Sequence, residues 1–457
     1  MSFIGIDLGT SFIKGAVLDL EARELNHIQR LPFPNQLSSR NPLFCEFDPD
    51  EIVSAFRNLV TTLISVAPDC GGIVMCTQMH GMVLMNAQGR VLSPCLTWRD
   101  QRAMMPHPSG AGSYFDVMTR RINSRQLRQL GNELRPGTPS AFLFWLAEQG
   151  LLEPDLMPVS LPDFVLSVLA GSPPSVESSN AMAYGLLNLE TMDWHQEVIK
   201  ELGLSRLRWP RLRKHGEVVG QLKLGPRPVP CYTPVGDYQC ALLGALLEMG
   251  ELSLNISTGS QVSRLTSELT LGDYQTRPFF EGKFLNTFTH IPAGRALDVL
   301  VDLLTEMARG QQIPLPDPWP YIGQEALRVA GTDLHVDLNF FANPFGDRGT
   351  ISNIRQDNLT VAHLFRAAFD NMAKRYYDCA VRIWPDRSWE KLVFSGGLIG
   401  KIEALRQVIQ TRFQTDYRLA PFSEDTLAGL LVLALAFSGK AASIDHAMNE
   451  LRQVPQA

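Results

Sequence analysis

Two short turns carry the residue types that hold phosphate groups. The stretch ISTGSQ (256–261) offers Thr258 and Gly259, and GIDLGTSFIK (5–14) offers an earlier set: Asp7, Gly9, Thr10, Ser11 and Lys14. Glycine turns present backbone N–H groups to an anion, and an adjacent aspartate can hold Mg²⁺ through water. An ordinary hairpin explains the first turn taken alone. The two turns together favour a nucleotide triphosphate held from two sides.

A single aspartate after a glycine is the candidate proton acceptor. Asp237 lies in VGDYQ, just beyond a run of prolines. A carboxylate at such a junction can accept a proton from a substrate hydroxyl. It can also serve as the N-cap of the apolar helix expected after it. The two roles are compatible.

Two further stretches, TQMHG (77–81) and TWRDQR (97–102), combine amide, imidazole, indole, carboxylate and guanidinium groups. Such a mixture suits a polyol, whose hydroxyls need donors and acceptors and whose C–H face packs on an aromatic ring. The alternatives are a structural histidine and a surface ion pair between Asp100 and Arg102. The candidate sugar-binding residues are Gln78, Met79, His80, Trp98, Asp100 and Arg102. Gly396 and Gly397 form either a plain strand-to-helix turn or an adenine-binding edge.

The elements that must position these residues alternate between strands and helices. Residues 2–20 predict a strand–turn–strand, 48–67 an amphipathic helix capped by Asp48, and 72–79 a buried strand. Residues 82–92 predict a hairpin turning at 87–89. In the second half we expect a helix over 237–250, a strand–turn–strand over 252–267, a strand running through Gly396 and Gly397 into a helix, and a buried helix from 424. The resemblance between the turns at 6–11 and 256–261 suggests a duplicated unit.

Composition narrows the class of protein. The 457 residues favour more than one domain, and the proline cluster over 226–234 predicts domains at 1–234 and 235–457. A net charge of −6 without a basic run excludes nucleic acid as an expected partner. No export signal or membrane span is visible, so we expect a cytoplasmic protein without a membrane partner. The seven cysteines form no CxxC pair and are interpreted as reduced thiols.

Taken together, these motifs resemble the FGGY family of carbohydrate kinases. The resemblance runs from GIDLGTSFIK to EDTLAG (424–429). GTPSAFLFWLAEQ (137–149) is similar to the first family signature, with Phe142 where many members carry lysine, and GTISNIRQDNLTVAHLFRAAFD (349–370) to the second, with Asn353 in place of a glycine. FGDR (345–348) and SNAMAYGLLNLETMDW (179–194) match further family segments. GGLIGK (396–401) departs from the usual third glycine and serine.

The resemblance implies an α/β fold of the two-domain, actin-like ATPase (ribonuclease H-like) type. Each domain would be a mixed β-sheet flanked by helices, with the active site in the interdomain cleft. The cofactors implied are ATP and Mg²⁺, with the first turn, Thr258 and Gly259 at the phosphates, Gly396 and Gly397 at the adenosine end, and Asp7 near the metal. Asp237 becomes the general base.

The resemblance also suggests a substrate. QMHG (78–81) is similar to xylulokinases and sedoheptulokinases, and the segments at 236–263 and 284–304 look most like sedoheptulokinase. The reaction implied is phosphorylation of the terminal primary hydroxyl of a ketose. A xylulokinase or other pentulose or polyol kinase is the alternative, and a non-catalytic nucleotide-dependent binding protein is the rival from another class. A homodimer is a possible assembly.

Overall fold

The computed structural model describes residues 1–225 and 227–453, so Pro226 of the proline cluster lies outside the described residues. The chain divides into two compact units, described separately below. Unit 1 contains Met1–Leu246, Ser267–Phe284 and Pro421–Ala457, and unit 2 contains Leu247–Thr266 and Leu285–Ala420. The boundary expected between residues 234 and 235 stays a prediction.

The main sheet of unit 1 positions the first turn. Its strands lie in the order β13 (Val218–Leu222), β14 (Val229–Tyr232), β5 (Ile73–Thr77), β1 (Ser2–Leu8), β2 (Phe12–Asp19) and β3 (Glu24–Pro32), and β15 (Val235–Gly236) also pairs with β5. The hairpin β1–β2 is antiparallel, as predicted, and its register sets Asp7 opposite Lys14. β1 and β5 are parallel.

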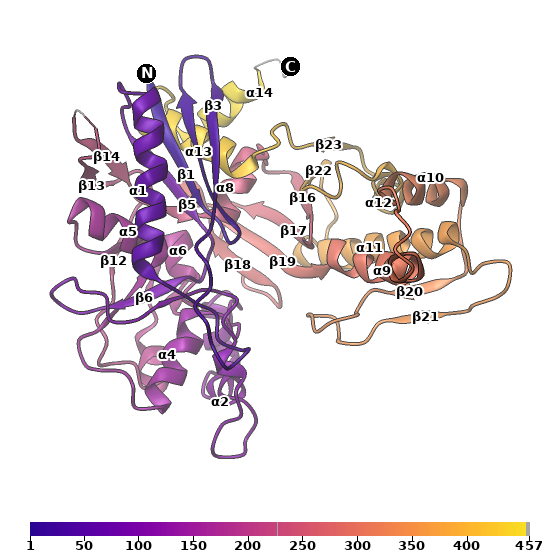
Figure 1. The fold of residues 1–457 in the computed structure, drawn as a ribbon, viewed down its shortest axis with the longest axis horizontal. Helices are drawn as coiled ribbons and strands as arrows, with labels where there is room; N and C mark the ends of the chain where they lie inside the picture. Colours follow the sequence, from indigo (N-terminus) through magenta and orange to yellow (C-terminus); the bar gives the residue numbers. More distant parts are fainter. Residues whose placement is uncertain (226, 454–457) are drawn as a thin grey trace. The chain divides into compact units, whose positions relative to one another are not determined.

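Alternation along β1 decides what faces each side of this sheet. Ile4, Ile6 and Leu8 belong to a core shared with α1 (Pro49–Val66) and α5 (Leu161–Ala170). Successive strand side chains point to opposite faces, so Asp7 projects to the other face, where α13 (Asp425–Phe437) packs. Figure 1 shows α1 running along the sheet. The predicted cap is confirmed: the Asp48 side chain accepts a hydrogen bond from the backbone N–H of Asp50.

Two glycines let α8 (Asp237–Gly244) and α13 pack backbone to backbone. A Cβ on Gly244 would lie 1.8 Å from the carbonyl oxygen of Asp425, and one on Gly429 would lie 1.9 Å from that of Cys240. The pairing of 244 with 425 and of 240 with 429 shows that the two helices run antiparallel. This close crossing fixes the start of α13 beside β1.

Unit 2 repeats the arrangement. Its sheet contains β19 (Phe284–Pro292), β17 (Gly259–Thr266), β16 (Glu251–Ile256), β22 (Lys391–Ser395) and β23 (Tyr417–Leu419), in that order. The hairpin β16–β17 is antiparallel, and β16 pairs in parallel with β22, just as β1 pairs with β2 and β5. Both predicted hairpins are therefore confirmed, and their shared surroundings support duplication.

The remaining elements of unit 1 are short. A small second sheet has the order β4 (Glu46–Phe47), β7 (Cys95–Leu96), β6 (Met82–Met85) and β8 (Met157–Ser160). The other elements of unit 1 are η1 (Arg102–Met104), α2 (Tyr114–Arg120), α3 (Ser124–Gln129), α4 (Pro139–Glu148), β9 (Ser175–Glu177), α6 (Ser178–Met182), β10 (Leu187–Asn188), β11 (Asp193–Trp194), α7 (Gln196–Glu201), β12 (Arg211–Arg213), β18 (Gln275–Pro278), η2 (Phe280–Gly282) and α14 (Ile444–Arg452). Unit 2 adds α9 (Gly294–Gly310), α10 (Trp319–Arg328), β20 (His335–Asp337), β21 (Thr350–Ser352), α11 (Val361–Ile383) and α12 (Glu403–Phe413).

Two predicted helices differ from the structure in their bounds. The helix expected over 237–250 ends at Gly244, and Leu246 then adopts a left-handed φ of 52° that α-helical backbone does not allow. The helix after Gly397 begins only at Glu403. The hairpin predicted over 82–92 is present in a short form: Met85 and Val91 form an antiparallel bridge, and the backbone N–H groups of Asn86 and Leu92 donate to the carbonyl oxygens of Arg90 and Leu84. All seven cysteines are buried free thiols, as interpreted.

Candidate functional site

Asp7 lies at the end of β1 with one carboxylate oxygen in use. Its Oδ2 accepts a hydrogen bond of 2.8 Å from Oγ1 of Thr426 at the start of α13. Its Oδ1 is buried without a hydrogen-bond partner, and Asp7 as a whole is 5% exposed. Burial raises the pKa of Asp7, while Thr426 and Lys14 oppose the rise. A buried acceptor without a partner, next to the turn of a phosphate-type hairpin, is suited to a cation or to a donor supplied by a ligand.

Glu424 orders the cations beside Asp7. It is buried and accepts from Nζ of Lys14 at 2.9 Å, and its second oxygen pairs with Arg30 on β3. Glu424 and Thr426 flank Asp425 in EDTLAG, a segment whose sequence indicated only the start of a helix. Lys14 and Arg30, the partners of Glu424, lie more than 390 residues earlier in the chain.

Asp237 is the first residue of α8, and its pKa lies near neutral pH. The cap position belongs to Gly236, so the alternative of Asp237 as the N-cap is wrong. Burial, followed by the negative charge of Asp7, raises the pKa of Asp237 to about 7, and Arg277 partly opposes the rise. A neighbouring carboxylate, Asp425, has its pKa raised to about 6, again chiefly by burial. A carboxylate that titrates near neutrality can act as a general base.

A chain of hydrogen bonds joins the first turn to the expected sugar-binding residues. Nε1 of Trp98 donates to Oγ1 of Thr10 at 3.0 Å, and that hydroxyl donates to Oε1 of Gln78 at 3.1 Å. Nε2 of Gln78 donates to the carbonyl oxygen of Gly9 at 3.3 Å. Trp98 remains 43% exposed, so its ring is available to a ligand. The structure therefore brings together residues that are 88 positions apart.

A buried ion pair lies behind Met79 and was missed by sequence reasoning. Arg277 on β18 donates to both carboxylate oxygens of Glu133, at 2.6 and 3.1 Å. Its guanidinium also lies 3.6 Å from Sδ of Met79 and 5.3 Å from the ring centre of Tyr238. Charge interactions connect Arg277 with Asp237, and Glu133 with His80. His80 itself has a left-handed φ of 70°, which a non-glycine residue adopts at a cost.

Asp100 and Arg102 are held inside the protein, so the alternative of a surface ion pair is wrong. Oδ1 of Asp100 accepts from the backbone N–H and Nε of Arg102, and Oδ2 accepts from the backbone N–H of Cys45 and from Nη2 of Arg102. Asp100 is fully buried, and Arg102 stacks over Phe44 at 4.5 Å. The pair stabilises the loop that carries Trp98.

The second turn belongs to unit 2 and is described on its own. Thr258 and Gly259 are exposed at the tip of the β16–β17 hairpin. The backbone N–H groups of Gly294 and Arg295, at the start of α9, donate to the carbonyl oxygens of Ser257 and Thr258, each at 3.0 Å. Gly396 has a φ of 94°, and a Cβ there would lie 2.5 Å from the carbonyl oxygen of Ile256, so glycine is required. Gly397 is exposed next to it.

The carboxylates of unit 1 fit a magnesium ion held through water. Among the described residues, no three His, Cys, Asp or Glu side chains form a ready-made metal site. Mg²⁺ commonly keeps several waters and binds one or two carboxylates plus phosphate oxygens. The unused Oδ1 of Asp7 provides such an acceptor.

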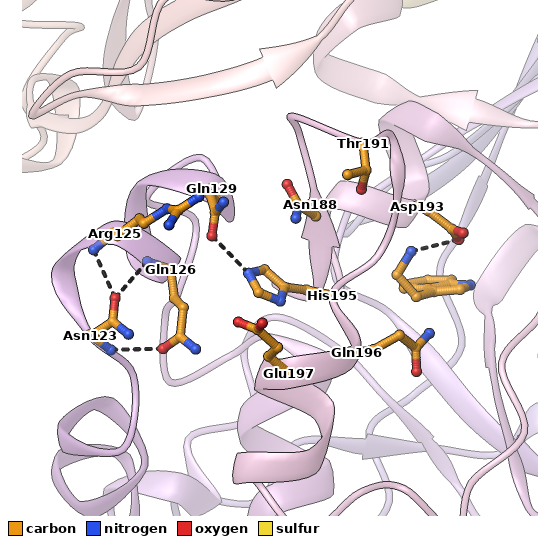
Figure 2. Close-up of a pocket in the computed structure, with 11 residues that line it drawn as sticks. Asn123, Arg125, Gln126, Gln129, Asn188, Thr191, Asp193, His195, Gln196 and Glu197 are labelled. Atoms are coloured by element: carbon orange, nitrogen blue, oxygen red, sulfur yellow. Dashed lines mark hydrogen bonds between the residues drawn. The ribbon is translucent and has the colours of Figure 1, made fainter.

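A separate polar pocket of about 510 Å³ lies between α3, β11 and α7 (Figure 2). Nε2 of the buried His195 lies 3.1 Å from Oε1 of Gln129, and the two side chains point toward one another. The Asn123 side chain caps α3. None of the site residues predicted from sequence lines this pocket. Several of the polar side chains that line it form hydrogen bonds with one another, within the described part of unit 1.

Comparison with known proteins identifies the family. The profile of the FGGY family of carbohydrate kinases, N-terminal domain, matches residues 2–244. The chain belongs to the FGGY family. It is similar to xylulose kinase of Escherichia coli, with 27% identity over 269 residues that cover 56% of this chain and 52% of the relative. It is also similar to gluconokinase of Bacillus subtilis, with 21% identity and coverage of 97% and 88%. The chain spans about half the length of the xylulose kinases that it matches.

Solved structures of FGGY sugar kinases share the fold. Gluconate kinase from Lactobacillus acidophilus superposes with a TM-score of 0.83 at 17% identity, covering 98% of this chain and 92% of that one. Glycerol kinase from Plasmodium falciparum, solved with ADP, gives 0.83 at 18% identity, covering 99% and 93%. The predicted α/β, two-domain, actin-like ATPase fold is confirmed. Among the described residues, no helix has the length and apolar character needed to cross a bilayer.

Proposed function

We propose that this FGGY protein transfers the γ-phosphate of ATP to the terminal primary hydroxyl of a ketose. The observation that carries the proposal is Asp237, a carboxylate with a pKa of about 7 that is electrostatically coupled to Asp7 of the phosphate-type turn. Asp7 in turn belongs to a hairpin whose Thr10 is hydrogen-bonded to the exposed Trp98. A general base and a phosphate turn are parts that phosphoryl transfer to a hydroxyl uses, and the exposed aromatic ring offers a surface for the C–H face of a sugar.

In the proposed reaction, Asp237 accepts the proton of the substrate hydroxyl as that oxygen attacks the γ-phosphorus and the bond to the β–γ bridging oxygen breaks. The proton passes to solvent after the product leaves. Lys14 and the backbone N–H groups of the first turn would hold the phosphates, with Asp7 holding Mg²⁺ through water. Mg²⁺, when bound with ATP, supplies positive charge to the phosphate oxygens. Thr258 and Gly259 are proposed as the second phosphate turn, and Gly396 and Gly397 as the adenosine end.

Sedoheptulose is the first candidate substrate and D-xylulose the alternative. The QMHG stretch fits either sugar. The segments around 236–263 and 284–304 support sedoheptulose, and the relatives named xylulose kinase support D-xylulose. The sugar would contact Gln78, Met79, His80 and Trp98. The roles first expected for Asp100 and Arg102 change to positioning, because their polar atoms are engaged with one another.

The test is ADP release with Mg-ATP in the presence of sedoheptulose, D-xylulose, D-ribulose, glycerol or no sugar. We expect sugar-dependent release, with a loss of about 100-fold or more in kcat in the Asp237→Asn variant. The matched control is Asp155→Asn, which makes the same chemical change at an exposed position. ATP binding without sugar-dependent ADP release would support the non-catalytic binding protein instead, and near-normal turnover by Asp237→Asn would remove Asp237 as the base.

A further inference from the structure

A pocket of about 760 Å³ in unit 1, distinct from the one in Figure 2, contains none of the candidate site residues. Its walls come from the turn after β6 (85–89), the end of α5 with the loop that follows it (167–174), the start of β8 and the residues at the start of β12. Arg208 and Arg211 line this pocket, and its described lining includes no Asp or Glu side chain. We call it the arginine pocket.

Hydrogen bonds hold the walls of the arginine pocket. The backbone N–H of Arg208 donates to the carbonyl oxygen of Leu156 at 2.8 Å, and β12 pairs in parallel with β9. In the turn after β6, Oδ1 of Asn86 accepts from the backbone N–H groups of Gln88 and Arg90, at 3.1 and 2.9 Å. The pocket is therefore formed without a ligand, so that binding does not have to order these segments.

The two arginines of this pocket are not neutralised by acidic side chains. Within residues 1–225 and 227–453, the guanidinium groups of Arg208 and Arg211 form no ion pair and no hydrogen bond. Glu217 interacts electrostatically with Arg211, but its direct ion pair, of 2.8 Å, is with Arg213. Two unpaired guanidiniums in a pocket without carboxylates concentrate positive charge in a chain whose net charge is −6.

The other polar groups of the arginine pocket include further donors. Because Oδ1 of Asn86 is used within its own turn, the Nδ2 group is left to donate, and it has no acceptor among the described residues. Trp209 is half-buried, with its ring centre 5.0 Å from that of Trp194, and no described residue accepts from its Nε1. Apolar walls are supplied by Met85, Met157, Val168, Pro173 and Pro174. Donors, an indole and apolar walls together suit an anion that is attached to a ring.

We propose that the arginine pocket binds a phosphate monoester, with Arg208 and Arg211 donating to the phosphate and Trp209 contacting the ring that carries it. At neutral pH a phosphate monoester has a charge of about −1.5 to −2, which balances two guanidiniums better than a single carboxylate does. Arginine forms short, charge-assisted and often bidentate hydrogen bonds to phosphate. A nucleotide and a sugar phosphate share this chemistry, and only the nucleotide has an aromatic base to stack on the indole. The inference is independent of the proposed kinase activity.

The experiment is isothermal titration calorimetry of the full chain with adenosine monophosphate, ribose 5-phosphate and adenosine, each with Mg-ADP present to occupy the candidate nucleotide site. We expect both esters to bind and adenosine to bind at least about 10-fold more weakly. Arg208→Met and Arg211→Met should each weaken binding of the esters by about 10- to 100-fold. Both side chains are exposed, so these variants should fold. The matched control is Arg206→Met, at an exposed position of the same segment outside the pocket, which should have no effect.

The two esters separate the possible sources of the ligand. Tighter binding of adenosine monophosphate assigns a nucleotide, whereas equal affinity for the two esters assigns a sugar phosphate, and either result supports the site. Absence of binding at millimolar concentration, or binding that Arg208→Met and Arg211→Met leave unchanged, overturns the inference. Binding that is lost in Lys14→Met and kept in both pocket variants belongs to the candidate site and overturns it as well. None of these outcomes bears on sugar-dependent ADP release, which tests the kinase proposal separately.

Discussion

Replacing Asp237 with asparagine should make the ligand-free protein more stable at alkaline pH while removing its proposed activity. The carboxylate is enclosed by protein and faces the charge of Asp7, which is why its pKa rises from 3.8 to about 7. Above that pH the folded protein must keep a charge where burial and repulsion oppose it. Asparagine has nearly the same shape without the charge.

The magnitude follows from the pKa. A rise of about three pH units at about 1.4 kcal/mol each sets an upper limit of about 4 kcal/mol on the strain that ionisation imposes. The side chain keeps some exposure, and part of the repulsion is shared with Asp7, so we expect a gain of about 1–2 kcal/mol. For a unit of this size the gain corresponds to an increase in Tm of about 2–6 °C.

The pH dependence separates this explanation from a general packing effect. Because the pKa of Asp237 is higher in the folded than in the unfolded chain, the stability that its protonated form contributes is full below about pH 4 and is lost as the pH rises through about 7. The advantage of Asp237→Asn should therefore be complete near pH 8 and about one third as large near pH 5. The assay is Tm by differential scanning calorimetry at both pH values, with Asp155→Asn as the control. Equal Tm values at about pH 8, or a gain of the same size at both pH values, would refute the reasoning.

Three other predictions come from the same structure. If Asp237 is the base, kcat/KM should rise as the pH passes through about 7, and a pH–rate profile that is flat between about pH 6 and 8 would contradict this. Gly429→Ala should lower Tm, because the added Cβ would lie 1.9 Å from the carbonyl oxygen of Cys240. Helices α8 and α13 must then separate, at a cost of about 1–3 kcal/mol. The control is Gly323→Ala, in open space on α10, which should be neutral or slightly stabilising. Burial lowers the pKa of His195, so the unfolded chain takes up a proton first and Tm should fall as the pH drops below about 6.5; His195→Gln should fall less steeply over the same range of pH.

The sequence correctly predicted the elements that depend on residues close to one another in the chain. The alternating apolar residues of β1 predicted the strand, and Asp48 followed by Pro49 predicted the start of α1, because cap and periodicity act within a few residues. Glycine and hydroxyl residues at 9–11 and 257–259 predicted both turns. The end of α8 was missed because Leu246, a good helix former, adopts a left-handed conformation before β16.

The parts of the site that could not be predicted depend on contacts between distant segments. Glu424 meets Lys14 across 410 residues, and Glu133 meets Arg277 across 144. No local sequence pattern predicts which distant residues form such an ion pair. The burial of Asp100 and Arg102 was missed for a related reason. Two opposite charges two residues apart are usually solvated, and here distant groups compensate their burial: the backbone N–H of Cys45, the carboxylate of Glu46 and the ring of Phe44.

The last segment of the chain has a consequence for how the protein is made. Residues 421–453 pack with the first strands, where Thr426 holds Asp7 and Glu424 holds Lys14 and Arg30. During synthesis the opening hairpin leaves the ribosome hundreds of residues before these partners exist, and the face of β1 that α13 covers stays open meanwhile. A chain that stops before residue 421 would therefore lose the order of its phosphate turn even though every residue of that turn is present.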